Sequence, residues 1–262
     1  MADINHFLNT IHLGDSIELM KNLPKEKIDL ILTDPPYNAS DGGINLPKNT
    51  TGGPYYKVNE EWDKFGVFEN YLDFTKNWTK VADSTLKPNG AILVCCSFHN
   101  IGEIILSLKE LNYKFLNIVT WKKTNPMPNI TKRTLTHSTE FVLWFAKSKG
   151  WTFNYADMKK YNDGKQLRDI WEFPLCQGTE RIKSSNGRAA HPTQKPLELF
   201  KRLIEMSSKK GDIILDPFVG TGTTAIASMA LDRRWIGIDN NSFYVEIANK
   251  RIKEYENINN IE

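Results

Sequence analysis

The chain has 262 residues, 40% of them hydrophobic and 25% charged, which is ordinary for a globular protein with one large domain. No run approaches the length of an apolar membrane span, and the first residues lack the features of a signal peptide, so we expect a cytoplasmic protein. Its cysteines, Cys95, Cys96 and Cys176, lack the spacing of a zinc site or a disulfide framework, so we expect no metal and free thiols.

Short apolar runs bounded by turn residues predict buried strands. In chain order these runs are 28–33, 91–97, 115–121, 140–146, 212–215 and 235–238. Apolar residues at helical spacing predict helices at 68–86, 101–111, 196–208, 223–231 and 244–255. Strands that alternate with helices predict a single α/β domain over residues 1–262, with a mostly parallel sheet covered on both faces.

Two segments follow neither pattern. Residues 38–60 are rich in Gly, Asn, Thr and Pro and form a long loop directly after a predicted strand. Residues 147–190 mix aromatic, basic and turn-forming residues and are predicted to be an irregular insertion. Long stretches of this kind inside a compact domain are usually functional or mobile.

The first predicted strand leads into Asp34, Pro35, Pro36 and Tyr37. The carboxyl edge of an open α/β sheet is where ligands bind. The prolines carry no N–H, so a carboxylate and a carbonyl remain as acceptors for both N–H groups of an exocyclic base amine. A fixed Asp34 stabilises the positive charge that builds up on an attacking nitrogen, and Tyr37 offers a ring for a flipped-out base. The alternative is a plain turn with a surface tyrosine.

Near the C-terminus a predicted strand ends at Asp216 and leads into a turn with Gly220 and Gly222. Glycines let a ligand approach the backbone at a helix N-terminus. The turn lacks the lysine of a phosphate-binding loop, and it fits a dinucleotide fingerprint only weakly. Asp239 ends the next strand, where a carboxylate can accept hydrogen bonds from ribose hydroxyls. A tight turn and a helix cap remain the alternative.

With both motifs in hand, the chain resembles the beta class of DNA amino-methyltransferases over nearly its whole length. The resemblance implies a circularly permuted, Rossmann-like methyltransferase fold with a mixed seven-stranded sheet, and S-adenosylmethionine as cofactor. It implies catalytic roles for Asp34, Pro35, Pro36 and Tyr37. It implies cofactor contacts from Asp15, His191, Thr193, Lys195, Asp216, Phe218, Gly220, Thr221, Gly222, Thr223 and Asp239. Residues 169–172 are similar to a tract that closes the variable region in this class, so 147–190 is expected to be the target-recognition insertion, and 38–60 a mobile active-site loop.

Charge is unevenly distributed, although the net value is only +3. Residues 114–210 hold 19 basic and 8 acidic residues, whereas the remainder holds 15 basic and 23 acidic residues. A polyanionic partner explains one basic region on an acidic body, with a solvated surface as the alternative. Within this region Lys122, Lys123, Lys132 and Arg133 are candidates for contacts with DNA phosphates.

The resemblance implies direct methyl transfer to the N6 amine of an adenine flipped out of double-stranded DNA, and such a transfer needs no cysteine nucleophile. Cytosine N4, RNA or a protein amide as target, and a non-catalytic DNA-binding subunit, remain the alternatives. The resemblance leaves a homodimer and a separately acting cognate restriction endonuclease open as partners.

Overall fold

The computed structural model describes residues 3–38, 63–66, 68–129, 132–184, 187 and 189–259. Its strands are β1 (Thr10–Leu13), β2 (Ile28–Thr33), β3 (Leu86–Cys96), β4 (Lys114–Lys123), β5 (Thr139–Ala146), β6 (Ile170–Phe173), β7 (Ile213–Asp216) and β8 (Arg234–Asp239). Its α-helices are α1 (Ser16–Lys21), α2 (Phe68–Thr85), α3 (Ile101–Glu110), α4 (Tyr155–Met158), α5 (Leu197–Ser207), α6 (Thr223–Met229) and α7 (Ser242–Asn259). Short 3-10 helices cover Ile4–His6 and Lys159–Asn162.

The strands form one sheet in the order β1-β8-β7-β2-β3-β5-β4-β6. Neighbours are parallel from β1 to β3, β5 is antiparallel to both β3 and β4, and β6 is parallel to β4. The predicted mixed α/β sheet is therefore confirmed. Eight strands are described where seven were expected. The two edge strands, β1 and β6, have four residues each and are not buried throughout, so neither gives the continuous apolar run that marks a buried strand.

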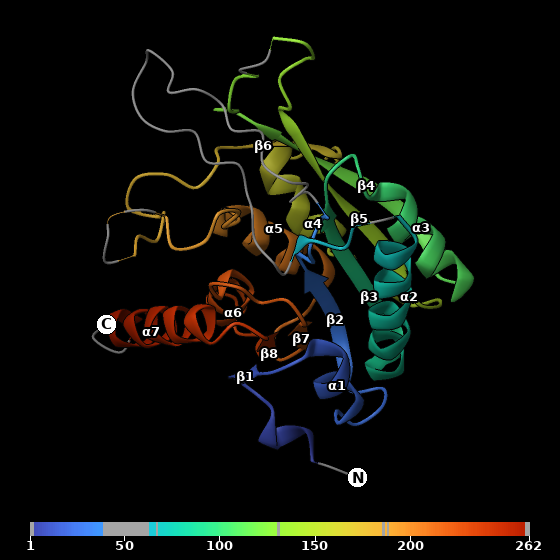
Figure 1. The fold of residues 1–262 in the computed structure, drawn as a ribbon. Helices are drawn as coiled ribbons and strands as arrows, with labels where there is room; N and C mark the ends of the chain where they lie inside the picture. Colours follow the sequence, from blue (N-terminus) through green and yellow to red (C-terminus); the bar gives the residue numbers. More distant parts are fainter. Residues whose placement is uncertain are drawn as a thin grey trace.

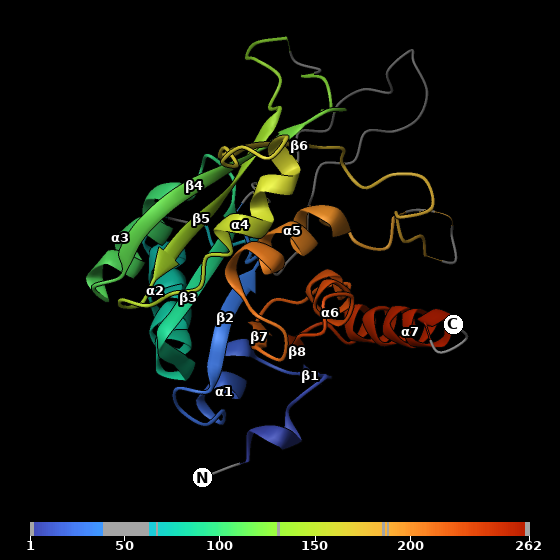
Figure 2. The same ribbon diagram turned by 180° about the vertical axis from the view of Figure 1, so that it is seen from behind.

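Helices cover both faces of the sheet (Figures 1 and 2), with α1, α2 and α3 on one face and α4, α5, α6 and α7 on the other. Successive residues of β2 point to opposite faces, so Ile31 packs with Trp78 of α2, whereas Leu30 and Leu32 pack with Leu203 of α5. Burial on both faces explains why the central strands are apolar throughout.

The carboxyl ends of β1, β8, β7 and β2 lie at one edge of the sheet, because these four neighbours are parallel. After β7 the chain enters α6 on one face, whereas the first helix after β2 in the described chain is α2 on the other face. Strand connections that leave a sheet in opposite directions open a crevice between the two strand ends. Both sequence motifs therefore flank the place where this fold binds ligands.

The segment 147–190, expected as an irregular insertion, contains α4, a 3-10 helix and β6. β6 pairs with β4, so part of this segment extends the main sheet. The loop 38–60 lies outside the described residues except for Asn38. Among the described helices none is long and apolar enough to cross a membrane.

Candidate active site

A cavity of about 280 Å³ opens at the carboxyl ends of β1, β2, β7 and β8. It is lined by all four catalytic candidates, Asp34, Pro35, Pro36 and Tyr37. It is also lined by these cofactor candidates: Asp15, His191, Thr193, Lys195, Asp216, Phe218, Gly220, Thr221, Thr223 and Asp239. Gly222, the remaining candidate, is not among the described residues that line the cavity and is the N-cap of α6. The fold thus brings two motifs that are about 180 residues apart in the sequence into one cavity.

The glycine turn after β7 follows a backbone path that other residues adopt poorly. Gly220 has a φ of 51° and Gly222 a φ of 81°. A Cβ at Gly222 would lie 3.2 Å from the Cβ of Ala248 in α7. Glycine at position 222 therefore permits both the left-handed conformation and the close approach of α7.

Asp239, at the end of β8, presents a carboxylate in a fixed orientation. Its two oxygens accept hydrogen bonds from the backbone N–H groups of Gly220 and Asn241, each at 2.9 Å. Asp15 lies at the end of the neighbouring β1, where it caps α1 by accepting from the N–H of Glu18 at 2.9 Å. Burial raises the pKa of Asp239, and the two N–H groups counteract this by stabilising the carboxylate.

Asp216 connects the glycine turn to the strand that carries Asp34. Its side chain accepts hydrogen bonds from the hydroxyl of Thr33 in β2 at 2.8 Å, from the N–H of Phe218 at 3.1 Å, and from the hydroxyl of Thr224. The residue is only 3% exposed, and burial raises the pKa of its carboxyl to about 7. Asp216 therefore fixes the relative position of the two motifs.

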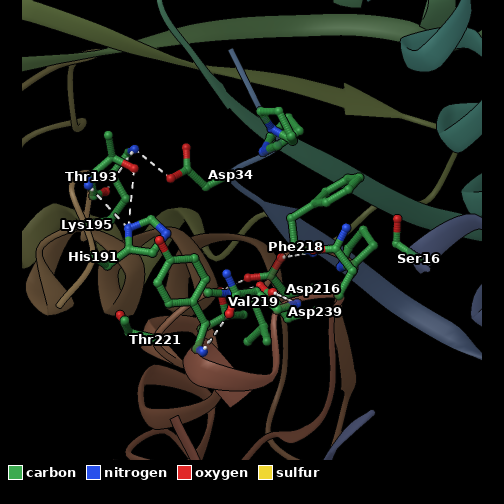
Figure 3. Close-up of a pocket in the computed structure, with 18 of the residues that line it drawn as sticks. Ser16, Asp34, His191, Thr193, Lys195, Asp216, Phe218, Val219, Thr221 and Asp239 are labelled. Atoms are coloured by element: carbon green, nitrogen blue, oxygen red, sulfur yellow. Dashed lines mark hydrogen bonds and ion pairs between the residues drawn. The ribbon is translucent and has the colours of Figure 1, made fainter. Parts of the chain in front are cut away.

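Both carboxylate oxygens of Asp34 accept hydrogen bonds. The hydroxyl of Tyr37 donates to Oδ1, and the ammonium of Lys195 donates to Oδ2, each at 2.6 Å. Figure 3 shows Lys195 beside Asp34, on the far side of the cavity from Ser16. Burial raises the pKa of Asp34, and the adjacent Lys195 opposes this shift. The same ammonium lies 5.0 Å from the centre of the Tyr37 ring.

The backbone after Asp34 is held from two sides. The hydroxyl of Tyr71 donates to the carbonyl of Pro36 at 2.8 Å and accepts from the amide of Asn100 at 2.7 Å. The carboxylate of Asp63 accepts from the N–H of Tyr37 at 2.6 Å. Within the described part of the chain, the carbonyl of Pro35 receives no hydrogen bond. The motif thus keeps one carbonyl available beside the carboxylate of Asp34.

Lys195 belongs to a chain of alternating charges. Its ammonium, on a side chain that is 5% exposed, lies 3.5 Å from Oε2 of Glu140 in β5. Oε1 of Glu140 pairs with Lys123 of β4 at 2.8 Å. Burial acts to raise the pKa of Glu140, but the two lysines outweigh it, so this pKa is lowered. Burial also opposes the charge of Lys195, but Asp34 and Glu140 prevail and raise its pKa.

His191 lies between the two motifs. Its Nδ1 accepts from the N–H of Thr193 at 3.2 Å, and its ring centre lies 4.6 Å from that of Tyr244. Burial, assisted by Lys195 and Arg181, lowers the pKa of His191 to about 3. The ring is therefore neutral near pH 7 and adds no positive charge to the cavity.

The lining of the cavity is strongly anionic. Among the described residues five aspartates line it, although the pKa of Asp216 is raised to about 7, and the one lysine that lines it there, Lys195, pairs with Asp34. Such a lining repels phosphate groups and suits a ligand with positive charge and hydroxyl groups.

The four predicted DNA contacts lie outside this lining. Lys122 forms an exposed ion pair with Glu172 at 2.7 Å, and Lys123 faces Glu140. Lys132 and Arg133 are exposed. Sequence reasoning did not find the partners Glu140, Asp63, Tyr71 and Asn100, because each acts on a residue distant in the sequence.

A family model described as DNA methylase matches residues 28–250. This range contains both motifs and most of the chain, so the protein belongs to this family, the N6/N4 DNA methylases. The resemblance to DNA amino-methyltransferases that rests on residues 34–37 and 218–222 is thereby confirmed.

Two bacterial relatives match nearly the whole chain. The chain is 45% identical to the Type II methyltransferase M.HinfI of Haemophilus influenzae, over 99% of this chain and 73% of that protein. It is 42% identical to the Type II methyltransferase M2.LlaDCHI of Lactococcus lactis subsp. cremoris, over 92% of this chain and 88% of that protein.

Solved structures support the fold. The M1.HpyAVI–SAM complex is 30% identical, with a TM-score of 0.65 over 93% of this chain and 98% of that one. PvuII DNA methyltransferase (cytosine-N4-specific) is 20% identical, with a TM-score of 0.71 over 94% of this chain and 90% of that one. At 20% identity, the similarity to PvuII DNA methyltransferase shows a shared fold and nothing more.

Proposed function

We propose that this protein transfers the methyl group of S-adenosylmethionine to the N6 amine of adenine in double-stranded DNA. The observation that carries the proposal is the pair of acceptors at the cavity: the carboxylate of Asp34 and the carbonyl of Pro35, which receives no hydrogen bond within the described part of the chain. An exocyclic amine has two N–H groups, and this pair matches them.

The two acceptors prepare the nitrogen for reaction. When both N–H groups are held outside the plane of the base, the nitrogen lone pair is drawn out of conjugation with the ring. The negative charge of Asp34 then stabilises the positive charge that develops on the nitrogen, and this preorganised stabilisation is strongest in a site that excludes water. Tyr37 lines the same cavity and offers its ring to the flipped base.

The cavity fits S-adenosylmethionine. This cofactor supplies a sulfonium methyl group, carries hydroxyl groups, an ammonium and a carboxylate but no phosphate, and has a net positive charge. The anionic lining matches that charge, and the similar M1.HpyAVI structure is a complex with SAM. Asp239 is oriented to accept from ribose hydroxyls, while Phe218, Gly220 and Thr221 line the adjoining wall.

Direct transfer requires no enzyme nucleophile. Cys95 and Cys96 lie inside β3, where burial raises the pKa of both thiols and disfavours the reactive thiolate. The residues linked to Asp34 by ion pairs carry no thiol; they are Lys195, Glu140 and Lys123.

DNA binding is assigned to the basic region. Lys132 and Arg133 are exposed and available to phosphates, and Lys122 is half exposed beside Glu172. Target recognition is assigned to residues 147–190 together with the loop 38–60. A homodimer and a separately acting restriction endonuclease remain predictions.

The test is methyl transfer from labelled S-adenosylmethionine to unmethylated genomic DNA, followed by digestion to nucleosides. N6-methyldeoxyadenosine is the expected product, and sequencing of the modified sites then gives the recognition sequence. N4-methyldeoxycytidine would overturn the proposed base while keeping the reaction. Absence of labelled DNA, with labelled RNA or protein in parallel reactions, would overturn DNA as the substrate.

A further inference from the structure

Lys195 lies between two carboxylates. Its ammonium is 2.6 Å from Oδ2 of Asp34 and 3.5 Å from Oε2 of Glu140. Oε2 of Glu140 is buried and receives no hydrogen bond within the described chain, whereas Oε1 is held by Lys123 at 2.8 Å. A buried carboxylate oxygen without a donor is unusual, because such groups are normally satisfied. Glu140 thus presents an open acceptor to Lys195.

The proposed reaction conflicts with the arrangement seen around Asp34. Both oxygens of Asp34 are occupied, Oδ1 by the hydroxyl of Tyr37 and Oδ2 by Lys195. Each oxygen can accept a further hydrogen bond, but an amine that gains positive charge beside Oδ2 is repelled by the ammonium unless the ammonium moves away. A buried ammonium that loses its carboxylate without finding another is strongly destabilised. The displaced Lys195 therefore needs a second acceptor within its reach.

We infer that Glu140 is a positioning residue that takes over the ammonium of Lys195 when the amine of the target base occupies Asp34. The inference rests on the proposed function, in which Asp34 accepts that amine. The shift is short, since Lys195 has a flexible stem and already lies within ion-pair distance of Oε2. It leaves the net charge of the cluster unchanged, because two lysines and two carboxylates are present before and after it.

Lys123 completes the arrangement. Its ion pair with Oε1 fixes Glu140 and leaves Oε2 directed toward Lys195. The side chain of Lys123 is 12% exposed, which suits a partner inside the protein better than a contact with a DNA phosphate. On this assignment Lys123 serves the reaction through Glu140.

The variant Glu140→Gln tests the inference. It removes the second carboxylate, so Lys195 stays on Asp34 and opposes entry of the amine. We expect kcat at saturating DNA and S-adenosylmethionine to fall about 100-fold, because the ammonium then stays beside the nitrogen on which positive charge develops. The dissociation constants for DNA and for S-adenosylmethionine should change less than about threefold, because phosphate and cofactor contacts are untouched. Losses in both affinities that match the loss in kcat would show a merely structural role and overturn the inference.

Asp29→Asn is the matched control. Asp29 lies in β2, pairs with Lys87 at 2.5 Å and is 17% exposed, against 18% for Glu140. It does not line the cavity. We expect a similar loss of stability in thermal unfolding but a kcat within about twofold of the parent.

A double-mutant cycle separates action through Lys195 from a general effect. In the background of Lys195→Met, the added change Glu140→Gln should lower kcat by less than about threefold, since there is no ammonium left to reposition. A further 100-fold loss in that background would overturn the inference. Glu140→Asp keeps the charge and tests the same point if Glu140→Gln does not fold. Its carboxylate is one methylene shorter, so an intermediate loss of about tenfold is expected.

Failure of the inference and failure of the proposed function give different results. Methylated cytosine would change the target base, but the rate comparison would still hold, because cytosine N4 is also an exocyclic amine. Equal kcat values for the parent and Glu140→Gln would overturn the role of Glu140 whichever base is methylated.

Discussion

In the half of the cavity formed by β1, β7 and β8, three aspartates accept hydrogen bonds from backbone N–H groups that follow closely in the chain. Asp15 accepts from Glu18, Asp216 from Phe218, and Asp239 from Asn241. In the other half, Asp34 is held by the ammonium of Lys195, which also lies 3.5 Å from Glu140, a residue outside the described lining of the cavity. Backbone donors cannot leave their acceptors while the fold is intact, whereas an ammonium can exchange one carboxylate for another. The first half is therefore suited to hold a cofactor in one orientation, and the second to admit and release a base.

The largest expected effect comes from removing the carboxylate of Asp34, which is held by the ammonium of Lys195. Asp34→Ala should lower kcat for methyl transfer by about 1,000-fold or more, because the charge that stabilises the transition state is lost. Binding of S-adenosylmethionine, measured by calorimetry, should stay within about threefold, since the backbone-held half is unchanged. Retention of a tenth of the parent activity would contradict the catalytic assignment.

A change in the half of the cavity formed by β1, β7 and β8 should instead weaken cofactor binding and leave kcat nearly unchanged. Gly222→Ala forces a non-glycine residue to a φ of 81° and brings its Cβ within 3.2 Å of Ala248. A cost of about 1–2 kcal/mol for the left-handed conformation predicts a loss of roughly 10-fold in affinity for S-adenosylmethionine. At saturating cofactor, kcat should be nearly unchanged.

Gly102→Ala is the matched control for Gly222→Ala. Gly102 lies in α3, and a Cβ there meets no atom within 4 Å, so this variant should be neutral or slightly more stable. Equal affinities for the two alanine variants would show that the turn does not depend on its glycine.

The basic residues fall into two groups: those expected to contact DNA phosphates, and Lys123, which faces Glu140. Lys132→Ala combined with Arg133→Ala should weaken DNA binding about tenfold at moderate salt and reduce the slope of log affinity against log salt by about 2. Lys123→Met should leave that slope unchanged but lower kcat, because Lys123 faces Glu140. Binding titrations from low to high salt measure both slopes. An unchanged slope for the first variant would remove Lys132 and Arg133 from the DNA interface.

The smallest effect concerns stability against pH. Burial lowers the pKa of His191 from 6.5 to about 3, so its contribution to stability is lost as pH falls from 6.5. Burial raises the pKa of Asp216 from 3.8 to about 7, so its contribution is lost as pH rises from 3.8. Between pH 3.8 and 6.5, His191 therefore makes the free energy of unfolding rise with pH, whereas Asp216 makes it fall.

Without His191, the fall in unfolding free energy with rising pH that Asp216 causes should no longer be offset. For His191→Asn, the free energy of unfolding in urea should fall more steeply than for the parent between pH 4.5 and 6.5, by roughly 2 kcal/mol. Parallel curves for the two proteins would show that His191 does not titrate differently in the folded and unfolded states.

Much of the fold was readable from short stretches of sequence. The strands predicted at 28–33, 140–146 and 235–238 correspond to β2, β5 and β8, because burial on both faces leaves a continuous apolar run. The edge strands β1 and β6 were missed, since partial burial produces no such run. The order of the strands, and with it the crevice between β7 and β2, follows from no local pattern.

The sequence by itself determined the contiguous parts of the site. Residues 34–37 and 218–222 each combine a strand end with a turn, and the chemistry of each can be argued from neighbouring residues. The partners of Asp34 were decided by tertiary structure alone. Sequence reasoning assigned Lys195 to the cofactor and Lys123 to DNA, and it gave Glu140 no role.

The physical reason lies in the antiparallel pairing of β4 and β5. Because these strands run in opposite directions, the end of β4 and the start of β5 meet at the edge of the sheet where β2 ends. Lys123 and Glu140 are thereby brought to Lys195 and Asp34, although up to 161 residues separate the members of one ion pair. Charges interact through space and leave no periodic pattern along the chain, so only the folded structure shows which of them are partners.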